Sequence, residues 1–451
     1  MDLPRKQLFT TRTLILLSIP AILEQTLANV VGLADSVMVS SVGEAAISGV
    51  SLVDNVSGVI LNLLTSLSIG GGIVTSQLIG AGNYDKARRS AGQNITMTVS
   101  ISILIGFLCA VFSRQIISLF FGHIEQDVME ACLIYMFWQA VSFPFLGLYS
   151  AGAAILRAGG DTKTAFYVSL LRNAVNIAGN AICIFGLKMG VAGVAIPTAI
   201  SRVVGAAAIV WAVMKSKASL HPNKNDIFHI DSSLMGRMFR LGMPTALENS
   251  VFQIGRVLTM SMVSLHGTVH IAANATASQL TGLANNFTQG VRTASMTIIG
   301  QCVGAGDEDQ IKRNFRKLLI MSYLCNFICG FPMLLFRHSI LGLYATLSPE
   351  TLDLAAKLML INLGFAFIIY TPSWFIVGPL RAANDTTFPM VASIISMFIF
   401  RLTLARILCV ELGWGVVGVW YAMIVDWACR AVIFTIRWYS GAWKKRCHLH
   451  A

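Results

Sequence analysis

Charged side chains are scarce in this 451-residue chain: they make up 12% of it, against about 25% of a typical soluble domain. Hydrophobic residues make up 55%. This balance excludes an ordinary soluble or disordered protein and indicates a membrane protein. Apolar segments of roughly 20 residues, each long enough to cross the ~30 Å core of a bilayer, recur along the whole chain. The first is longer than the apolar region of a signal peptide, so we expect it to be a span.

Motifs for nucleotide, metal and nucleophilic chemistry are missing as well. The sequence contains no phosphate-binding loop, no HExxH and no GxSxG, which argues against ATP-driven pumping by this chain alone. Its nine cysteines are scattered and form no CxxC pair, so we expect free thiols, no metal site and no cofactor. An intramembrane enzyme would need clustered His, Cys or Asp within spans, and we therefore do not expect an enzyme.

What the chain does contain is an internal duplication at a spacing of 224 residues. Blocks of similar sequence keep this register over half the chain, which chance seldom produces. The usual transport site of such a duplicated membrane module is a cavity between its two halves. The blocks that repeat are Leu17–Glu24 with Leu241–Glu248, Gln77–Gly82 with Gln301–Gly306, and Leu156–Thr162 with Leu380–Thr386.

Six spans can be counted in each half. Six is an even number, so each half begins and ends on the same side of the membrane, and the halves should be parallel repeats. We predict an all-α membrane protein with twelve transmembrane helices in two six-helix lobes. The predicted parts are an N-terminal lobe at 1–214, a polar linker at 215–240, a C-terminal lobe at 241–440 and a tail at 441–451.

Lysine and arginine placement predicts the orientation. Most of the 33 basic residues fall on one set of loops, whereas the opposite loops hold only Arg114, Lys188 and Arg337. By the positive-inside rule, the linker and both termini are cytoplasmic in a multi-pass protein of the inner (plasma) membrane. Because topology accounts for the net charge of +12, we expect the lipid bilayer as a partner and no nucleic acid.

Ionisable side chains within spans are costly in lipid and are therefore functional candidates. Asp35 stands near the outer end of the first span, and its repeat counterpart is Thr259, so this carboxylate belongs to one half only. We expect Asp35 to have a function, with a structural ion pair or an interfacial cap as the alternative. The other candidates, which could line a substrate cavity, are Glu24, Asp54, Arg172, Glu248, Arg256, Arg292 and Arg401.

The fifth span carries a polar stripe. Arg172, Asn176 and Asn180 are spaced four apart, which places them on one face of a helix. Asparagine amides can hold helices together in lipid, and they can also offer carbonyl oxygens to a small cation. Arg172 could neutralise Glu24, and Arg401 could likewise neutralise Glu248.

Taken together, these residues resemble the multidrug and toxic compound extrusion (MATE) family of secondary transporters over essentially the whole chain. The match includes Pro20, Asp35 with the Ser36-Val37-Met38 that follows it, and the Gln-x-x-Gly-Ala-Gly turns. The resemblance implies that Asp35 is the coupling-ion carboxylate and that Pro20 is a hinge in the first helix. It also implies that Asn176, Asn180 and Thr198 join Asp35 in a polar network.

Two departures from the family bear on the coupling ion. Some members carry an aspartate where this chain has Asn180, so a Na⁺ site would have one carboxylate fewer. The acidic cation site of some bacterial relatives is not clearly present in the C-terminal lobe, where the seventh span offers Glu248, Gln253 and Arg256. Both departures favour H⁺ over Na⁺.

The resemblance implies a monomeric, cation-coupled antiporter that exports small organic compounds or drugs by alternating access. The alternative is a lipid-linked oligosaccharide or lipid flippase of the same wider superfamily. Arg292 has Ser68 as its repeat counterpart, so symmetry did not require a charge there. If Arg292 faces a cavity, anionic or zwitterionic substrates are favoured; otherwise the in-span arginines pair with Glu248 or Asp426 and only lock the lobe.

Overall fold

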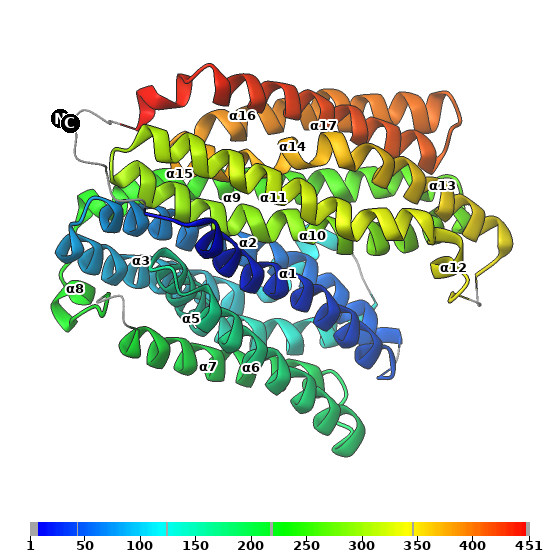
Figure 1. Cartoon of the computed structure of the whole chain (residues 1–451). Coiled ribbons are helices and arrows are strands. Elements are labelled where there is room, and N and C mark those ends of the chain that lie inside the picture. The colour runs from blue at the N-terminus through cyan, green and yellow to red at the C-terminus, as the bar shows by residue number, and fades with distance from the viewer. Residues whose placement is uncertain (1–7, 43, 123–124, 217–219, 345–346, 448–451) are drawn as a thin grey trace. The chain divides into compact units, whose positions relative to one another are not determined.

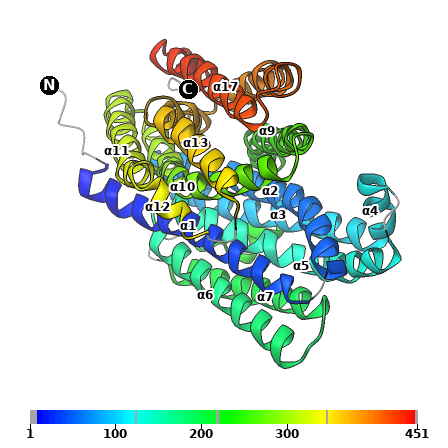
Figure 2. The same ribbon diagram turned by 90° about the vertical axis from the view of Figure 1, so that its right-hand side faces the viewer.

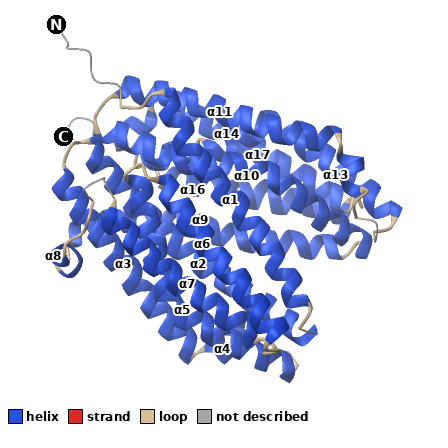
Figure 3. Ribbon diagram, turned by 60° about the horizontal axis from the view of Figure 1, so that its bottom comes forward, coloured by secondary structure: helices blue, strands red, loops and turns tan. Residues whose placement is uncertain are grey.

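The computed structural model describes residues 8–42, 44–122, 125–216, 220–344 and 347–447. Within these residues every regular element is a helix (Figure 3), which confirms the predicted all-α class. Parts of the predicted linker (217–219) and tail (448–451) lie outside the described residues. All nine cysteines are described and are free thiols.

The predicted spans are helical. Ten segments of the described chain are long and apolar enough to cross a membrane. Two further long helices, α9 (Ser232–Ser264) and α10 (Thr268–Gly304), occupy the predicted seventh and eighth spans. The ten are α1 (Thr11–Ser40), α2 (Glu44–Gly80), α3 (Tyr84–Val111), α5 (Gln126–Ala158), α6 (Thr162–Ala181) with η1 (Ile182–Gly186), α7 (Ala192–Lys215), α11 (Glu308–Leu335), α13 (Pro349–Phe365) with η2 (Ala366–Tyr370), α14 (Thr371–Phe375) and α15 (Val377–Ala382), α16 (Thr387–Ser396) with η3 (Met397–Leu404) and η4 (Ile407–Glu411), and α17 (Val416–Tyr439).

Short helices connect or extend these spans. They are α4 (Ser113–Phe121), α8 (Lys224–Phe228), α12 (Arg337–Leu341) and the 3-10 helix η5 (Ala442–Arg446). The composite span at 349–382 is interrupted where Pro372 and Pro379 withhold backbone N–H donors.

By its internal contacts the chain forms two compact units. We call Leu27–Ala246 the N-unit, and Met1–Thr26 together with Leu247–Ala451 the C-unit. Two helices pass from one unit to the other, α1 after Thr26 and α9 after Ala246. The predicted lobe boundaries describe the sequence duplication rather than this packing, and they stay a prediction.

In the N-unit, α5 packs against α2, α3 and α7 (Figures 1 and 2). In the C-unit, α10 packs against α11, α13 and α15, and α17 packs against η3 and α14. The core of each unit is apolar. Phe143 on α5 and Phe375 on α14 are fully buried in their respective cores.

The duplication is visible in matching turns. After α2 and α10 the chain reverses through Gly82 (φ 73°) and Gly306 (φ 67°), in the left-handed region that glycine tolerates at low cost. Asn83 then caps α3, and Asp307 caps α11, each through a side-chain oxygen that accepts a backbone N–H. Both copies of the Gly-Ala-Gly turn are thus followed directly by a capping residue of the next helix.

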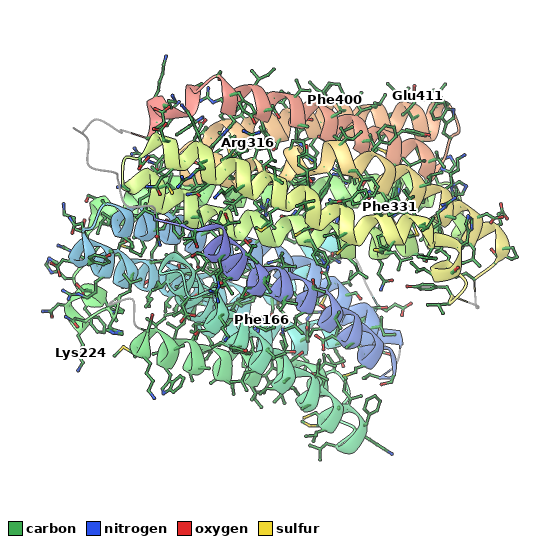
Figure 4. All side chains as sticks on the ribbon, viewed as in Figure 1. Phe166, Lys224, Arg316, Phe331, Phe400 and Glu411 are labelled. Carbon is green, nitrogen blue, oxygen red and sulfur yellow. The ribbon has the colours of Figure 1, made fainter. Side chains whose placement is uncertain are left out.

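The outer surfaces carry the repeat as well. On α11 the exposed Phe327, Ile328, Phe331 and Leu335 follow helical spacing, which makes one apolar stripe. The side chain of Phe331 can be followed in Figure 4. Residues 103, 104, 107 and 111 on α3, each 224 positions earlier, are also exposed and apolar. An exposed apolar stripe on a long helix fits contact with lipid tails.

The described part of the linker is docked on α3. Gln93 Nε2 donates to the carbonyl oxygens of Asp226 (2.7 Å) and His229 (2.9 Å). The Oε1 atom of Gln93 accepts the Asp231 backbone N–H at 2.9 Å. Arg88 Nε lies 3.0 Å from Asp226 Oδ2. These bonds fix the start of α9 to the N-unit.

Candidate functional site

A cavity of about 360 Å³ lies within the N-unit, between α1, α2, α5, α6 and α7. Small-molecule sites commonly have volumes of ~300–1,000 Å³, so this cavity is large enough for one small compound. The charged side chains of its lining are two carboxylates and two guanidinium groups, which balance one another. They belong to Asp35, Asp54, Arg172 and Arg202.

Asp35 is held by neutral groups. Asn180 Nδ2 on α6 donates a hydrogen bond to Asp35 Oδ1 at 3.0 Å. Asn176 on α6 lies beside the same carboxylate, and its amide also contacts the Thr198 hydroxyl of α7 at 3.1 Å. Within the described residues Asp35 makes no ion pair. The structure therefore brings together all four side chains that the sequence assigned to cation coupling.

The Asn176 amide fits this site in two orientations. In one, its nitrogen donates to Thr198 Oγ1 at 3.1 Å, while Thr198 donates to the Val194 carbonyl at 2.8 Å. In the other, its nitrogen donates to Asp35 Oδ1 (3.1 Å) and Oδ2 (3.2 Å), and its oxygen accepts from Thr198 at 3.1 Å. Because the two orientations place nitrogen and oxygen in nearly the same positions, the hydrogen-bond partners decide between them.

A second carboxylate, Asp54 on α2, lines the same cavity. Its Oδ1 accepts a hydrogen bond from Tyr135 Oη of α5 at 3.0 Å. Arg202 of α7 is buried near both groups and donates through Nη1 to Ser142 Oγ at 2.6 Å. Arg172 lies 4.5 Å from the ring centre of Tyr149, a cation–π distance.

Sequence reasoning did not single out Tyr135 or Gln139, although both line the cavity. With Ser142 they are spaced at i, i+4 and i+7, which places them on one face of α5. This polar stripe on an apolar span is the signal that could have identified them.

The C-unit carries a different set of buried charges. Arg381 Nη2 lies 2.7 Å from Glu248 Oε2, so Glu248 pairs with Arg381 rather than with Arg401. Asp426 accepts from Ser396 Oγ at 2.7 Å and from Arg430 Nη2 at 3.1 Å. Arg401 Nη1 is 3.8 Å from the same carboxylate.

The remaining candidates are spread over the C-unit. Glu24 is half-buried on α1, and Arg256 is exposed on α9. Arg292 is half-buried on α10 and makes no ion pair within the described residues; its Nε is a buried donor without a partner. Pro20 lies inside α1, a continuous helix. These residues do not belong to the N-unit cavity.

Comparison with known families identifies the chain. The model of the MatE family matches twice, at residues 20–182 and 244–407, once for each repeat. The chain belongs to the MatE family. The matches start 224 residues apart, which is the register of the sequence duplication, and together they cover more than half of the chain.

The similarity to known relatives covers almost the whole chain. A probable multidrug resistance protein NorM of Thermotoga maritima is 28% identical, with 99% of this chain and 96% of the relative covered. An FAD transporter of Shewanella oneidensis is 23% identical, with 90% of each chain covered. A solved outward-facing multidrug resistance MATE transporter superposes with a TM-score of 0.88 at 20% identity, covering 96% of this chain and 97% of that one.

The family and the fold establish the general class. The chain is a multi-pass membrane transporter with the MATE fold, as predicted. The two relatives differ in the compounds that their names give, so family membership leaves the substrate open.

Proposed function

We propose that this protein is a proton-coupled antiporter that exports small organic compounds by alternating access, with Asp35 as the proton carrier. The observation that carries the proposal is the set of neutral hydrogen-bond partners around Asp35, a carboxylate that lines a cavity and makes no ion pair within the described residues. A fixed ion pair would hold an aspartate ionised, whereas amides and a hydroxyl can accommodate both its charged and its neutral form.

The ionised form requires donors. With Asp35 charged, the Asn176 nitrogen faces it and donates to the two carboxylate oxygens, and Thr198 turns its proton to the Asn176 oxygen. Asn180 adds a further donor to Oδ1. The carboxylate then ties α1 to α6 and, through Thr198, to α7.

The protonated form requires an acceptor on one side. A proton on Oδ2 donates to the Asn176 oxygen once the amide turns over, and the amide nitrogen then donates to Thr198. Thr198 returns its own proton to the Val194 carbonyl. A single proton thus reverses two hydrogen bonds, Asp35–Asn176 and Asn176–Thr198, and turns the Thr198 proton to Val194. This is how occupancy of Asp35 would bias the packing of three helices.

Two prolines support a hinge role for the crossing helices. Pro20 precedes the change of unit in α1, and Pro244 precedes it in α9. Each proline removes one backbone hydrogen bond from its helix, which lowers the cost of bending there. We infer that both helices bend at these prolines when the transporter changes its open side.

We favour H⁺ over Na⁺ because Asn180 replaces the second carboxylate that would stand beside Asp35 in a stronger sodium site. Asp54 shares the cavity, but its Oδ1 is engaged by Tyr135. We further propose cytoplasmic termini, in keeping with the distribution of lysine and arginine, and a monomer as the working unit.

The test is transport in proteoliposomes under an imposed proton or sodium gradient, with the wild type and Asp35→Asn. The asparagine keeps the shape of the side chain but cannot carry a proton at neutral pH. We expect a proton gradient to drive the wild type, and we expect Asp35→Asn to lose uphill transport while it elutes and unfolds like the wild type. Asp85→Asn, at an exposed carboxylate on α3, is the matched control. Full uphill transport by Asp35→Asn would place coupling elsewhere.

A further inference from the structure

We propose that the C-unit contains a binding site for small aromatic anions, in which Arg292 and Arg430 lie beside the indole of Trp374. This inference rests on the proposed export function and names the substrate class. The ligand is a planar organic compound that carries a carboxylate, phosphate or sulfonate group.

The first observation is an excess of positive charge. Glu248 neutralises Arg381, and Asp426 lies between two arginines, 3.1 Å from Arg430 and 3.8 Å from Arg401. Arg292 is the fourth arginine of this group, and it alone makes no ion pair among the described residues. The charges in question are Arg292, Arg381, Arg401 and Arg430 against Glu248 and Asp426. Among these six described side chains, positive charges outnumber negative charges by two.

The second observation is that two of these arginines, Arg292 and Arg430, lie against the Trp374 ring. The guanidinium carbon of Arg430 is 4.8 Å from the Trp374 ring centre and 5.0 Å from that of Phe252. The Arg292 guanidinium is 6.0 Å from the same Trp374 ring. The two rings are themselves 6.0 Å apart. Arg292 also lies within electrostatic range of Arg381.

The third observation concerns unused donors. Among the residues that the structure describes, the buried Nε atoms of Arg292, Arg381 and Arg430 have no hydrogen-bond partner, and neither has Nε1 of Trp374. Arg381 and Arg430 are 2% and 1% exposed. A buried donor without an acceptor destabilises the folded state, and an unpaired cation within a membrane is costlier still. An anionic ligand supplies both the missing acceptors and the missing charge.

The proposed ligand would approach the cluster from its half-buried side. Arg292, Trp374 and Phe252 are half-buried, whereas Arg381 and Arg430 lie deeper. A guanidinium presents paired N–H donors that match the two oxygens of a carboxylate, phosphate or sulfonate. The indole and phenyl faces offer a stacking surface for a planar ring. The same cations repel a lipophilic cation.

Equilibrium binding of two dyes to the purified full-length protein tests the site. Fluorescein and rhodamine 6G share a xanthene ring but carry opposite charge, so their fluorescence anisotropy separates charge recognition from ring stacking. In nanodiscs of neutral lipid and without a gradient, we expect Arg292→Gln to weaken fluorescein binding at least tenfold and not to weaken rhodamine 6G binding. Arg292→Lys, which keeps the charge but not the planar fork, should show an intermediate loss.

Controls keep the outcome interpretable. Arg406→Gln removes an exposed arginine of the same unit that lies 4.0 Å from Glu411, and it should alter neither dye. Trp374→Leu should weaken fluorescein binding by removing the stacking face. Size-exclusion elution and thermal unfolding confirm that each variant is folded. Asp35→Asn should bind fluorescein like the wild type, so failure of proton coupling and failure of this site are distinguishable.

Three results would overturn the proposal. They are an equal loss of both dyes in Arg292→Gln, no loss of either, and displacement of fluorescein by phosphatidylglycerol but not by soluble benzoate. The last result would assign the arginine cluster to a lipid phosphate instead of a small aromatic anion. Selective loss of fluorescein, together with competition by benzoate, supports the site as proposed.

Discussion

The Asn180 side chain donates a hydrogen bond of 3.0 Å to Asp35 across 145 residues of sequence, which joins α6 to α1 in the N-unit. An amide stabilises the carboxylate by a dipole and not by a charge. Asp35 therefore keeps a neutral neighbour at the position where a second aspartate would compete with it for a proton or share a metal cation.

Asn180→Ala should weaken gradient-driven export less than Asp35→Asn does, because the amide tunes the carboxylate without carrying the proton. The initial rate of uphill transport in proteoliposomes measures this difference. Asn180→Asp should instead add Na⁺ stimulation, since two adjacent carboxylates can share a cation. A complete loss of transport in Asn180→Ala, with the fold intact, would contradict this division of roles.

Glu248→Gln should destabilise the C-unit because Arg381 is left as a buried, unpaired cation. Breaking a buried ion pair from one side typically costs about 3–5 kcal/mol. The double variant Glu248→Gln with Arg381→Gln should recover much of this loss, which thermal unfolding of the purified protein measures. Equal destabilisation by the single and the double change would show that Arg381 does not depend on Glu248.

Asp231 should give the stability of the protein a pH-dependent component. Hydrogen bonds from the Leu234 N–H and from Ser233 lower the pKa of this carboxyl, and Arg89 adds to the effect. A lowered pKa in the folded state means that the stabilisation is complete above the unfolded pKa of about 3.9 and is lost as the pH falls through the folded value.

Asp231→Ala should therefore unfold at a lower temperature than the wild type at pH 7, by the equivalent of about 1 kcal/mol for a lost helix cap. The difference in unfolding temperature between the variant and the wild type should become smaller below about pH 4. Asp231→Asn keeps a capping oxygen and should lose less. If this difference in unfolding temperature is the same at pH 7 and pH 3, the ionised carboxylate of Asp231 is not the cause of the stabilisation.

Cysteine labelling should find the linker cytoplasmic. In a background without native cysteines, Lys224→Cys in α8 should react with a membrane-impermeant maleimide only in inverted vesicles. Gln126→Cys at the start of α5 should react from outside intact cells, because an odd number of predicted spans separates the two positions. Labelling of Lys224→Cys in intact cells would reverse the predicted topology.

The sequence by itself determined the class, the spans and the duplication. Lipid leaves no water to satisfy backbone groups, so long apolar segments have to be helices, and their bounds can be predicted from composition. Glycine turns are equally local: Gly82 and Gly306 adopt positive φ because the chain must leave a helix there. The polar stripe of Asn176 and Asn180 could be predicted for the same reason, since it depends only on helical spacing.

Partners across helices were decided by the tertiary structure alone. Several arginines lie within the predicted spans, and only the tertiary structure shows that Glu248 of α9 pairs with Arg381 of α15. Tyr135 lies within hydrogen-bond distance of Asp54 because α5 lies beside α2. Arg292 and Arg430, 138 positions apart, converge on Trp374 without any local signal. Helical period fixes which face a side chain occupies, but the face that lies opposite depends on contacts between distant parts of the chain.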